Sequence, residues 1–176
     1  MTTTTITPEQ TMGDILEAIP AARRALFQRY HIGGCSSCAY ELTDTLAEVC
    51  KNKNILDVNE VIQHLHTAQE LDEKLQVDPD VVRGWLAEGL DFSFLDVRTS
   101  EEAVSGPVTE AEVLEFSRSA EYLALPKDRR FVFACEDTGK SLDVAAYFVG
   151  HEFTDVHVLR GGVPAWLGKD PVAEDV

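Results

Sequence analysis

The spacing of hydrophobic residues divides the chain into two parts. In residues 7–72 apolar side chains recur every three or four positions, as they do after Val58, which is typical of amphipathic helices. In residues 76–172 helical patterns alternate with short continuous apolar runs such as Phe131-Val132-Phe133-Ala134. The pattern therefore predicts a small all-α domain over 7–72 and an α/β domain over 76–172, whose central parallel sheet is flanked by helices.

Caps and glycines predict where the helices of the first part begin and end. Thr11, with Asp14 three residues later, indicates a helix start. A second helix is predicted from Ala21 to Tyr30, with Phe27 on its buried side, and Gly33-Gly34 is expected to end it.

Two Thr-x-x-Glu spacings predict helix starts in the second part, because the two side chains can cap each other's backbone N–H groups. The first spacing joins Thr99 to Glu102 and the second joins Thr109 to Glu112. The second is expected to begin an acidic helix that continues through Phe116.

Charge and composition narrow the classes of partner. The 176 residues include 15 Lys and Arg against 31 Asp and Glu, a net charge of −16. Such a surface repels nucleic-acid phosphates and anionic lipid, so neither nucleic acid nor a membrane is an expected partner. Neither a basic, apolar leader nor a run of about 18 apolar residues is present, which predicts a cytoplasmic protein. In that compartment the four cysteines are expected to be reactive or metal-binding rather than disulfide-bonded.

Cys135 is the leading candidate for catalysis. It ends a predicted buried strand, and a polar loop and a helix beginning near Ser141 follow it. Backbone N–H groups in that loop and the positive end of the helix dipole both favour a thiolate. A cysteine at a strand end is also commonly a small buried hydrophobic residue, so the local pattern leaves both interpretations open. The residues predicted to form a substrate-binding loop are Glu136, Asp137, Thr138, Gly139, Lys140 and Ser141.

Three segments carry a resemblance to a known family. They are Leu95-Asp96-Val97-Arg98, the loop from Cys135 to Ser141, and Arg160-Gly161-Gly162-x-x-Ala165-Trp166. In this order and spacing they resemble the rhodanese family. The resemblance implies a rhodanese-like fold and sulfur transfer, in which Cys135 takes sulfane sulfur as a persulfide and passes it on without a cofactor. Asp96 and Arg98 are expected to form a structural pair that braces the loop.

The chain departs from the family pattern at two places. Glu136 and Asp137 stand where many family members have basic or small residues, and their carboxylates oppose thiolate formation and repel a dianion such as thiosulfate. A low-molecular-weight or protein-bound persulfide is therefore the expected donor. The sequence after Gly106 lacks the strand-forming segment that is usual in the family, so one strand of the sheet is expected to be lost or rerouted.

Two other functions compete with sulfur transfer. Cysteine phosphatases of related fold grip phosphate with a longer loop that closes on arginine, whereas here Ser141 follows Lys140 and the loop is acidic, which disfavours this function. The second is a non-catalytic binding or regulatory module that binds a basic partner and is coupled to a helical domain with a redox or a metal- or iron–sulfur-binding role. The preferred interpretation is a sulfurtransferase that takes sulfur from a small donor or a persulfide-bearing protein, with a basic protein among its acceptors.

Cys35 and Cys38 form a Cys-x-x-Cys pair before a helix that is predicted to contain Leu42 and Cys50. Three interpretations stay open: a redox couple, two ordinary thiols, or part of a metal or iron–sulfur site. For a metal site, Cys50 and His31 are candidate further ligands, and a second chain could supply a matching pair.

The first part also resembles a known domain. Residues 7–68 are similar to a small helical domain whose signature is Gly-Cys-x-x-Cys followed by a Thr-Leu-x-x-x-Cys helix, here ending at Cys50. Such domains accompany iron–sulfur and hybrid-cluster proteins, which implies redox or cluster biology. The Cys35/Cys38 pair is therefore a candidate acceptor or reductant for sulfur held on Cys135.

Overall fold

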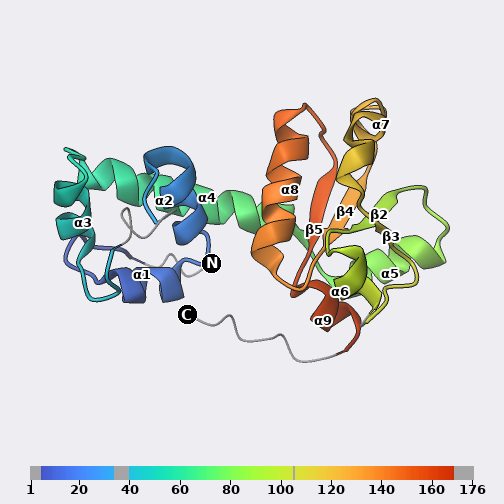
Figure 1. Cartoon of the computed structure of the whole chain (residues 1–176), viewed down its shortest axis with the longest axis horizontal. Helices are drawn as coiled ribbons and strands as arrows, with labels where there is room; N and C mark the ends of the chain where they lie inside the picture. Colours follow the sequence, from blue (N-terminus) through green and yellow to red (C-terminus); the bar gives the residue numbers. More distant parts are fainter. Residues whose placement is uncertain (1–4, 34–39, 105, 169–176) are drawn as a thin grey trace. The chain divides into compact units, whose positions relative to one another are not determined.

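The computed structural model describes residues 5–33, 40–104 and 106–168, and the chain forms two compact units, Met1–Lys74 and Leu75–Val176 (Figure 1). Each unit has hydrophobic clusters of its own. No helix within the described ranges has both the length and the apolar character needed to span a membrane.

The first unit packs helices around one core. They are α1 (Met12–Ala18), α2 (Ala22–Tyr30), α3 (Leu46–Asn52) and α4 (Val58–Leu75), the last of which reaches the boundary between the units. Each helix contributes fully buried side chains, among them Ile15, Leu26, Leu46 and Leu65. The cap predicted for α1 is present, because Thr11 Oγ1 accepts a hydrogen bond from the Asp14 N–H.

The predicted end of α2 at Tyr30 is confirmed, and Ala22 and Leu26 are buried as expected. Two details were wrong. Phe27 is 49% exposed rather than buried. The helix is ended by His31 rather than by the glycines, because the backbone of His31 turns into the left-handed region with φ of 55°.

α3 begins later than expected. Thr45 and Glu48 form a reciprocal capping box, in which each side chain accepts a hydrogen bond from the other residue's backbone N–H. The box sets the first helical residue at Leu46, so Leu42 lies outside the helix.

The second unit is built on a five-stranded parallel sheet with the order β1-β5-β4-β2-β3. The strands are β1 (Gln76–Val77), β2 (Ser93–Asp96), β3 (Glu112–Val113), β4 (Phe131–Ala134) and β5 (Val156–Leu159). The helices are α5 (Pro79–Ala87), α6 (Ser100–Val104), the 3-10 helix η1 (Phe116–Arg118), α7 (Ser119–Leu123), α8 (Thr138–Gly150) and α9 (Gly162–Trp166).

Both faces of this sheet are covered by helices. Side chains alternate along β4, so the strand contributes to a hydrophobic cluster on each face. On one face Phe131 and Phe133 pack against Phe148 of α8, with ring centroids 4.8 and 4.9 Å away. On the other face Val132 and Ala134 join a cluster with side chains of α5 and α9. The predicted parallel sheet flanked by helices is confirmed.

The prediction of an acidic helix after Thr109 was wrong. Thr109 Oγ1 donates to its neighbour Glu110 at 3.0 Å, and Glu112 begins β3 instead of capping a helix. β3 pairs with β2, and the Leu114 N–H continues the pairing with a hydrogen bond of 2.8 Å to the Asp96 carbonyl oxygen. The strand that was expected to be lost or rerouted is therefore present as the two-residue β3, and it pairs the outer edge of β2.

Candidate active site

The carboxyl ends of β2 and β4 mark the place where the strand order of the sheet reverses. The chain continues from β2 to β3 on one side and from β4 to β5 on the other. Connections that diverge in this way leave a crevice at the carboxyl edge of the sheet, where α/β proteins bind their ligands. Cys135 directly follows β4, and Asp96 ends β2 with Arg98 two residues later. The topology therefore brings these three predicted site residues to one edge of the sheet, where such folds bind ligands.

The Cys135 thiol is held in a buried environment. The residue is 1% exposed, and this burial raises the pKa of its thiol. Backbone N–H groups of Asp137 and Glu136 donate to the sulfur, and the Lys140 charge also acts to lower the thiol pKa. The backbone N–H groups that were expected to favour a thiolate are therefore present, but desolvation outweighs them and the net direction of the thiol pKa is upward.

The loop after Cys135 is shorter than predicted. α8 begins at Thr138 rather than near Ser141, because the Asp137 side chain caps the helix and accepts a 2.7 Å hydrogen bond from the Gly139 N–H. Only Glu136 and Asp137 form the loop, and the other four predicted loop residues, Thr138, Gly139, Lys140 and Ser141, form the first turn of α8.

Ser141 is fully buried, and its hydroxyl has no hydrogen-bond partner among the described residues. A buried hydroxyl without a partner is uncommon in folded proteins. The Ser141 hydroxyl is therefore a hydrogen-bonding group without a described partner in the first turn of α8, close in sequence to Cys135.

Arg98 joins β2 to the Cys135 loop. Its guanidinium makes a buried ion pair with Asp96, in which Nη2 donates to Oδ2 at 2.7 Å and Nε donates to Oδ1 at 3.0 Å. Nη2 also donates to the Gly106 carbonyl oxygen at 2.8 Å, and Nη1 contacts Glu136 Oε2 at 3.3 Å. The hydrogen bonds to Asp96 raise the pKa of Arg98. Arg98 is thus a fixed positive charge whose outer nitrogen reaches the residue after Cys135.

Glycines after β5 also shape the site, although they are not among the predicted site residues. The backbone of Gly162 has φ of +60° and lies against the Cys135 carbonyl oxygen, which in turn accepts a 2.9 Å hydrogen bond from the Val163 N–H. The signal that could have revealed this contact was the Gly161-Gly162 pair that directly follows a predicted strand.

A comparison with known protein families matches the part of the chain that contains this site. The sequence model for the rhodanese-like domain matches residues 67–169. The chain belongs to the rhodanese-like family. The match includes the five strands and the Cys135 loop, and it begins within α4.

Relatives of this rhodanese-like chain include proteins named for sulfur transfer. "Putative sulfurtransferase YtwF" of Bacillus subtilis (strain 168) is 29% identical over 109 residues, which are 61% of this chain and 93% of that protein. "Sulfurtransferase" of Allochromatium vinosum is 30% identical over 95 residues, which are 52% of this chain and 86% of that protein. The crystal structure of a rhodanese-like domain protein from Staphylococcus aureus has 24% identity and a TM-score of 0.45, covering 57% of this chain and 98% of that one.

The other cysteines of this rhodanese-like chain lie in the helical unit. Cys35 and Cys38 are outside the described residues. Cys50 is fully buried in α3, and burial raises the pKa of its thiol. Within the described ranges no group of three or more His, Cys, Asp or Glu side chains is placed to hold a metal ion. The proposals for Cys35 and Cys38 therefore rest on the sequence.

Proposed function

We propose that the protein is a sulfurtransferase that carries sulfane sulfur as a persulfide on Cys135. The observation that carries this proposal is the place of Cys135 at the carboxyl end of the central strand, with the N–H groups of Glu136 and Asp137 directed at its sulfur. These N–H groups and the Lys140 charge would stabilise negative charge on the thiolate and on the terminal persulfide sulfur. Membership of the rhodanese-like family and the sulfurtransferase names of its relatives support the same reaction class.

Each half of the reaction is a thiol–disulfide type of exchange. Cys135 attacks the outer sulfur of a donor persulfide, R–S–SH. A bond forms between Cys135 Sγ and that sulfur while the donor S–S bond breaks, and R–S⁻ leaves and takes up the proton released by the Cys135 thiol. An acceptor thiolate then attacks the outer sulfur on Cys135, the S–S bond to Sγ breaks, and Cys135 returns as a thiolate. No external oxidant or reductant is needed.

A persulfide suits this site better than thiosulfate as a donor. Glu136 is exposed at the mouth of the site and contacts the buried Arg98, so it offsets the positive charge that an anionic donor would use. The Asp137 carboxylate also acts to raise the Cys135 pKa. A donor without a dianionic sulfonate therefore meets less repulsion.

Intact-mass spectrometry tests this function. The reduced protein is exposed to a low-molecular-weight persulfide and, separately, to thiosulfate, with Cys135→Ser as the test variant and Cys50→Ala as the matched control. We expect a gain of one sulfur atom with the persulfide in the wild type and in Cys50→Ala, and none in Cys135→Ser. A gain that persists in Cys135→Ser would contradict the proposal.

One observation favours a second candidate, a non-catalytic binding or regulatory domain coupled to the helical unit. Burial of Cys135, which raises the pKa of its thiol, would slow sulfur chemistry. In this case neither donor would add sulfur to Cys135.

We propose that Cys35 and Cys38 act as the acceptor or the reductant of sulfur loaded on Cys135. The alternative role proposed for the pair is a metal or iron–sulfur site. Replacing both by serine without any change in Cys135 turnover would contradict the acceptor and reductant roles.

A further inference from the structure

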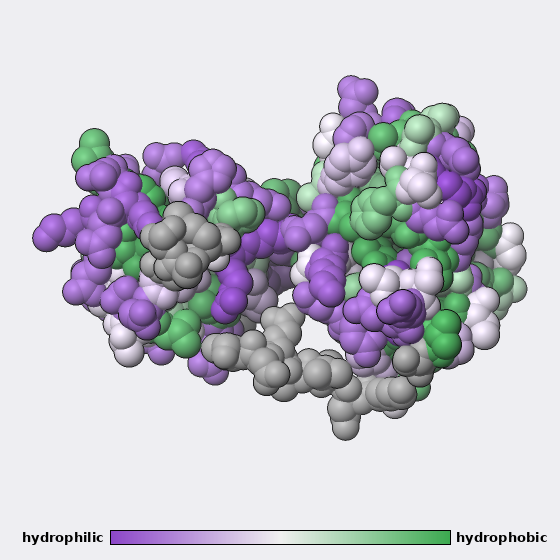
Figure 2. Space-filling model, in the orientation of Figure 1, coloured by the Kyte–Doolittle hydropathy of each residue, from purple (hydrophilic) through white to green (hydrophobic). Residues whose placement is uncertain are grey.

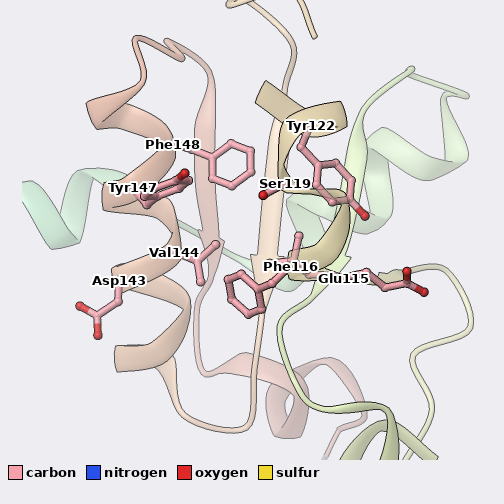
Figure 3. A pocket seen from close by; sticks show the side chains of 9 residues that line it. Glu115, Phe116, Ser119, Tyr122, Asp143, Val144, Tyr147 and Phe148 are labelled. Atoms are coloured by element: carbon pink, nitrogen blue, oxygen red, sulfur yellow. The ribbon is translucent and has the colours of Figure 1, made fainter. Parts of the chain in front are cut away.

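An apolar groove lies between α8 and the segment that follows β3. It has a volume of about 220 Å³, and Leu114 and Tyr122 contribute to its lining. Figure 3 shows Phe116 and Val144 pointing toward each other from the two sides, with Tyr147 one turn further along α8. The groove is therefore formed by elements on the face of the sheet that α7 and α8 cover.

Large hydrophobic side chains at this groove remain open to solvent. Phe116 is 68% exposed and Tyr147 is 49% exposed. Figure 2 shows hydrophobic side chains gathered between α8 and α7, with hydrophilic side chains around them. Exposed aromatic groups that border a cavity are typical of surfaces that bind another protein. Burying this apolar surface in a complex is favourable, because it is removed from water.

The charge around the groove selects the kind of occupant. Glu115 and Asp143 are exposed acidic residues that line it. The nearby cation Arg118 contacts Glu112 at 2.7 Å and Glu121 at 2.9 Å, so its charge is already matched. A second copy of this chain, with its net charge of −16, would be repelled, whereas a basic segment would be attracted.

The groove is connected to the candidate active site. The Leu114 N–H donates to the Asp96 carbonyl oxygen, and the Asp96 side chain holds Arg98, which reaches Glu136 beside Cys135. Along α8, Val144 is six residues beyond Thr138, which corresponds to about 9 Å, and Thr138 is three residues after Cys135. A segment bound in the groove could therefore present a cysteine near Cys135 through a few extended residues, each of which spans about 3.3–3.6 Å.

We propose that this groove docks the protein that receives sulfur from Cys135, through a segment in which a bulky apolar side chain is flanked by Lys or Arg. The assignment of the partner as the acceptor rests on the proposed sulfur transfer. Phe116 and Tyr147 cover the apolar side chain, and the exposed carboxylate of Glu115 attracts a flanking cation. The groove thus selects protein acceptors over small thiols by contacts outside the reacting sulfur.

The test uses defined peptides and the full chain. The probe is fluorescein-labelled Arg-Lys-Phe-Leu-Lys-Arg, compared with a peptide that has Ser-Ser in place of Phe-Leu and with Glu-Glu-Phe-Leu-Glu-Glu. The protein variants are Phe116→Ser, Glu115→Lys and the matched control Val81→Ser. The Val81 side chain is 44% exposed on α5, the helix that packs against the other face of the sheet.

We expect only the first peptide to bind, with a Kd that rises at least about tenfold in Phe116→Ser and not in Val81→Ser. Binding should weaken with added salt, and Glu115→Lys should reduce the preference for the basic peptide. Equal binding of the Phe-Leu and Ser-Ser peptides, equal binding by wild type and Phe116→Ser, or no binding of the first peptide would overturn the proposal. A dimer that Phe116→Ser dissociates would also overturn it, because the groove would then be an interface between copies.

A second measurement separates docking from chemistry. The basic peptide is extended by Gly-Gly-Cys, and sulfur transfer to it from loaded Cys135 is compared with transfer to dithiothreitol. Phe116→Ser should slow transfer to the peptide at least about tenfold and leave loading and transfer to dithiothreitol unchanged. Peptide binding should persist in Cys135→Ser. If binding persists but the wild type cannot be loaded, the docking surface stands and its assignment to a sulfur acceptor is overturned together with the proposed function.

Discussion

Gly162 lies so close to the backbone of Cys135 that a Cβ at position 162 would stand 2.2 Å from the Cys135 carbonyl oxygen. The two residues belong to different loops at the carboxyl edge of the sheet, one after β5 and one after β4. The contact means that the loop carrying the thiol keeps its place only while position 162 has no side chain.

Gly162→Ala should therefore displace the Cys135 loop. We expect a loss of unfolding free energy of about 1–3 kcal/mol from the positive φ, with a further loss from the clash, and a clear reduction in sulfur loading of Cys135. Gly89→Ala is the matched control, because Gly89 has φ of +69° but open space around a Cβ. Urea unfolding and intact-mass loading measure both effects, and equal behaviour of the two variants would contradict the role given to the contact.

Replacing Arg98 by methionine should be strongly destabilising. The change leaves the Asp96 carboxylate buried without its partner, which typically costs about 3–5 kcal/mol. Arg160→Met is the control, because the Arg160–Asp78 pair is exposed and such pairs contribute about 0–1 kcal/mol. Chemical denaturation of the two variants gives the comparison, and a similar small effect in both would show that the buried pair is not needed.

Glu136→Gln should shift the donor preference of the site. Removing the carboxylate leaves the outer nitrogen of Arg98 unmatched at the mouth, so an anionic donor meets less repulsion. We expect loading by thiosulfate to accelerate about two- to fivefold relative to loading by a persulfide. Glu121→Gln, which alters a carboxylate paired with Arg118, is the control. An unchanged ratio of the two loading rates would remove the electrostatic account of donor choice.

The pKa of Cys135 predicts how reactivity and stability depend on pH. Because burial raises the pKa of the folded thiol above its ordinary value of 9.0, alkylation of Cys135 by iodoacetamide should stay slow at neutral pH and accelerate as the pH rises through and beyond that value. Site-resolved mass spectrometry would follow the rate. An alkylation rate that is already high near neutral pH and does not increase with pH would contradict the raised pKa.

The same shift acts on stability. The folded state keeps its proton at a pH where the unfolded thiol has lost it, so the stabilising contribution is complete below the unfolded pKa near 9 and is lost as the pH rises through the folded pKa. Cys135→Ser should therefore lose less unfolding free energy than the wild type as the pH rises above the ordinary thiol pKa of 9.0. Some dependence should remain, because burial also raises the pKa of Cys50. Parallel slopes for the two proteins would contradict the prediction.

Local patterns predicted most elements of the rhodanese-like unit. The run around Phe131 had to be a buried strand because continuous apolar sequence fits a sheet covered on both faces, and the Thr99–Glu102 spacing formed the expected cap of α6. β3 was missed because Glu112 and Val113 form a strand only through their pairing with Leu95 and Asp96 of β2. A two-residue strand has no periodicity of its own that a sequence could reveal.

The sequence by itself determined that Cys135 follows a buried strand and precedes a helix, because strand and helix patterns depend on neighbouring residues. Only the tertiary structure decided the environment of the thiol. Arg98 reaches Glu136, and Gly162 lies against Cys135, across gaps in sequence that no local pattern spans. The direction of the Cys135 pKa was likewise decided by folding, since desolvation depends on all the atoms that the fold packs around the sulfur.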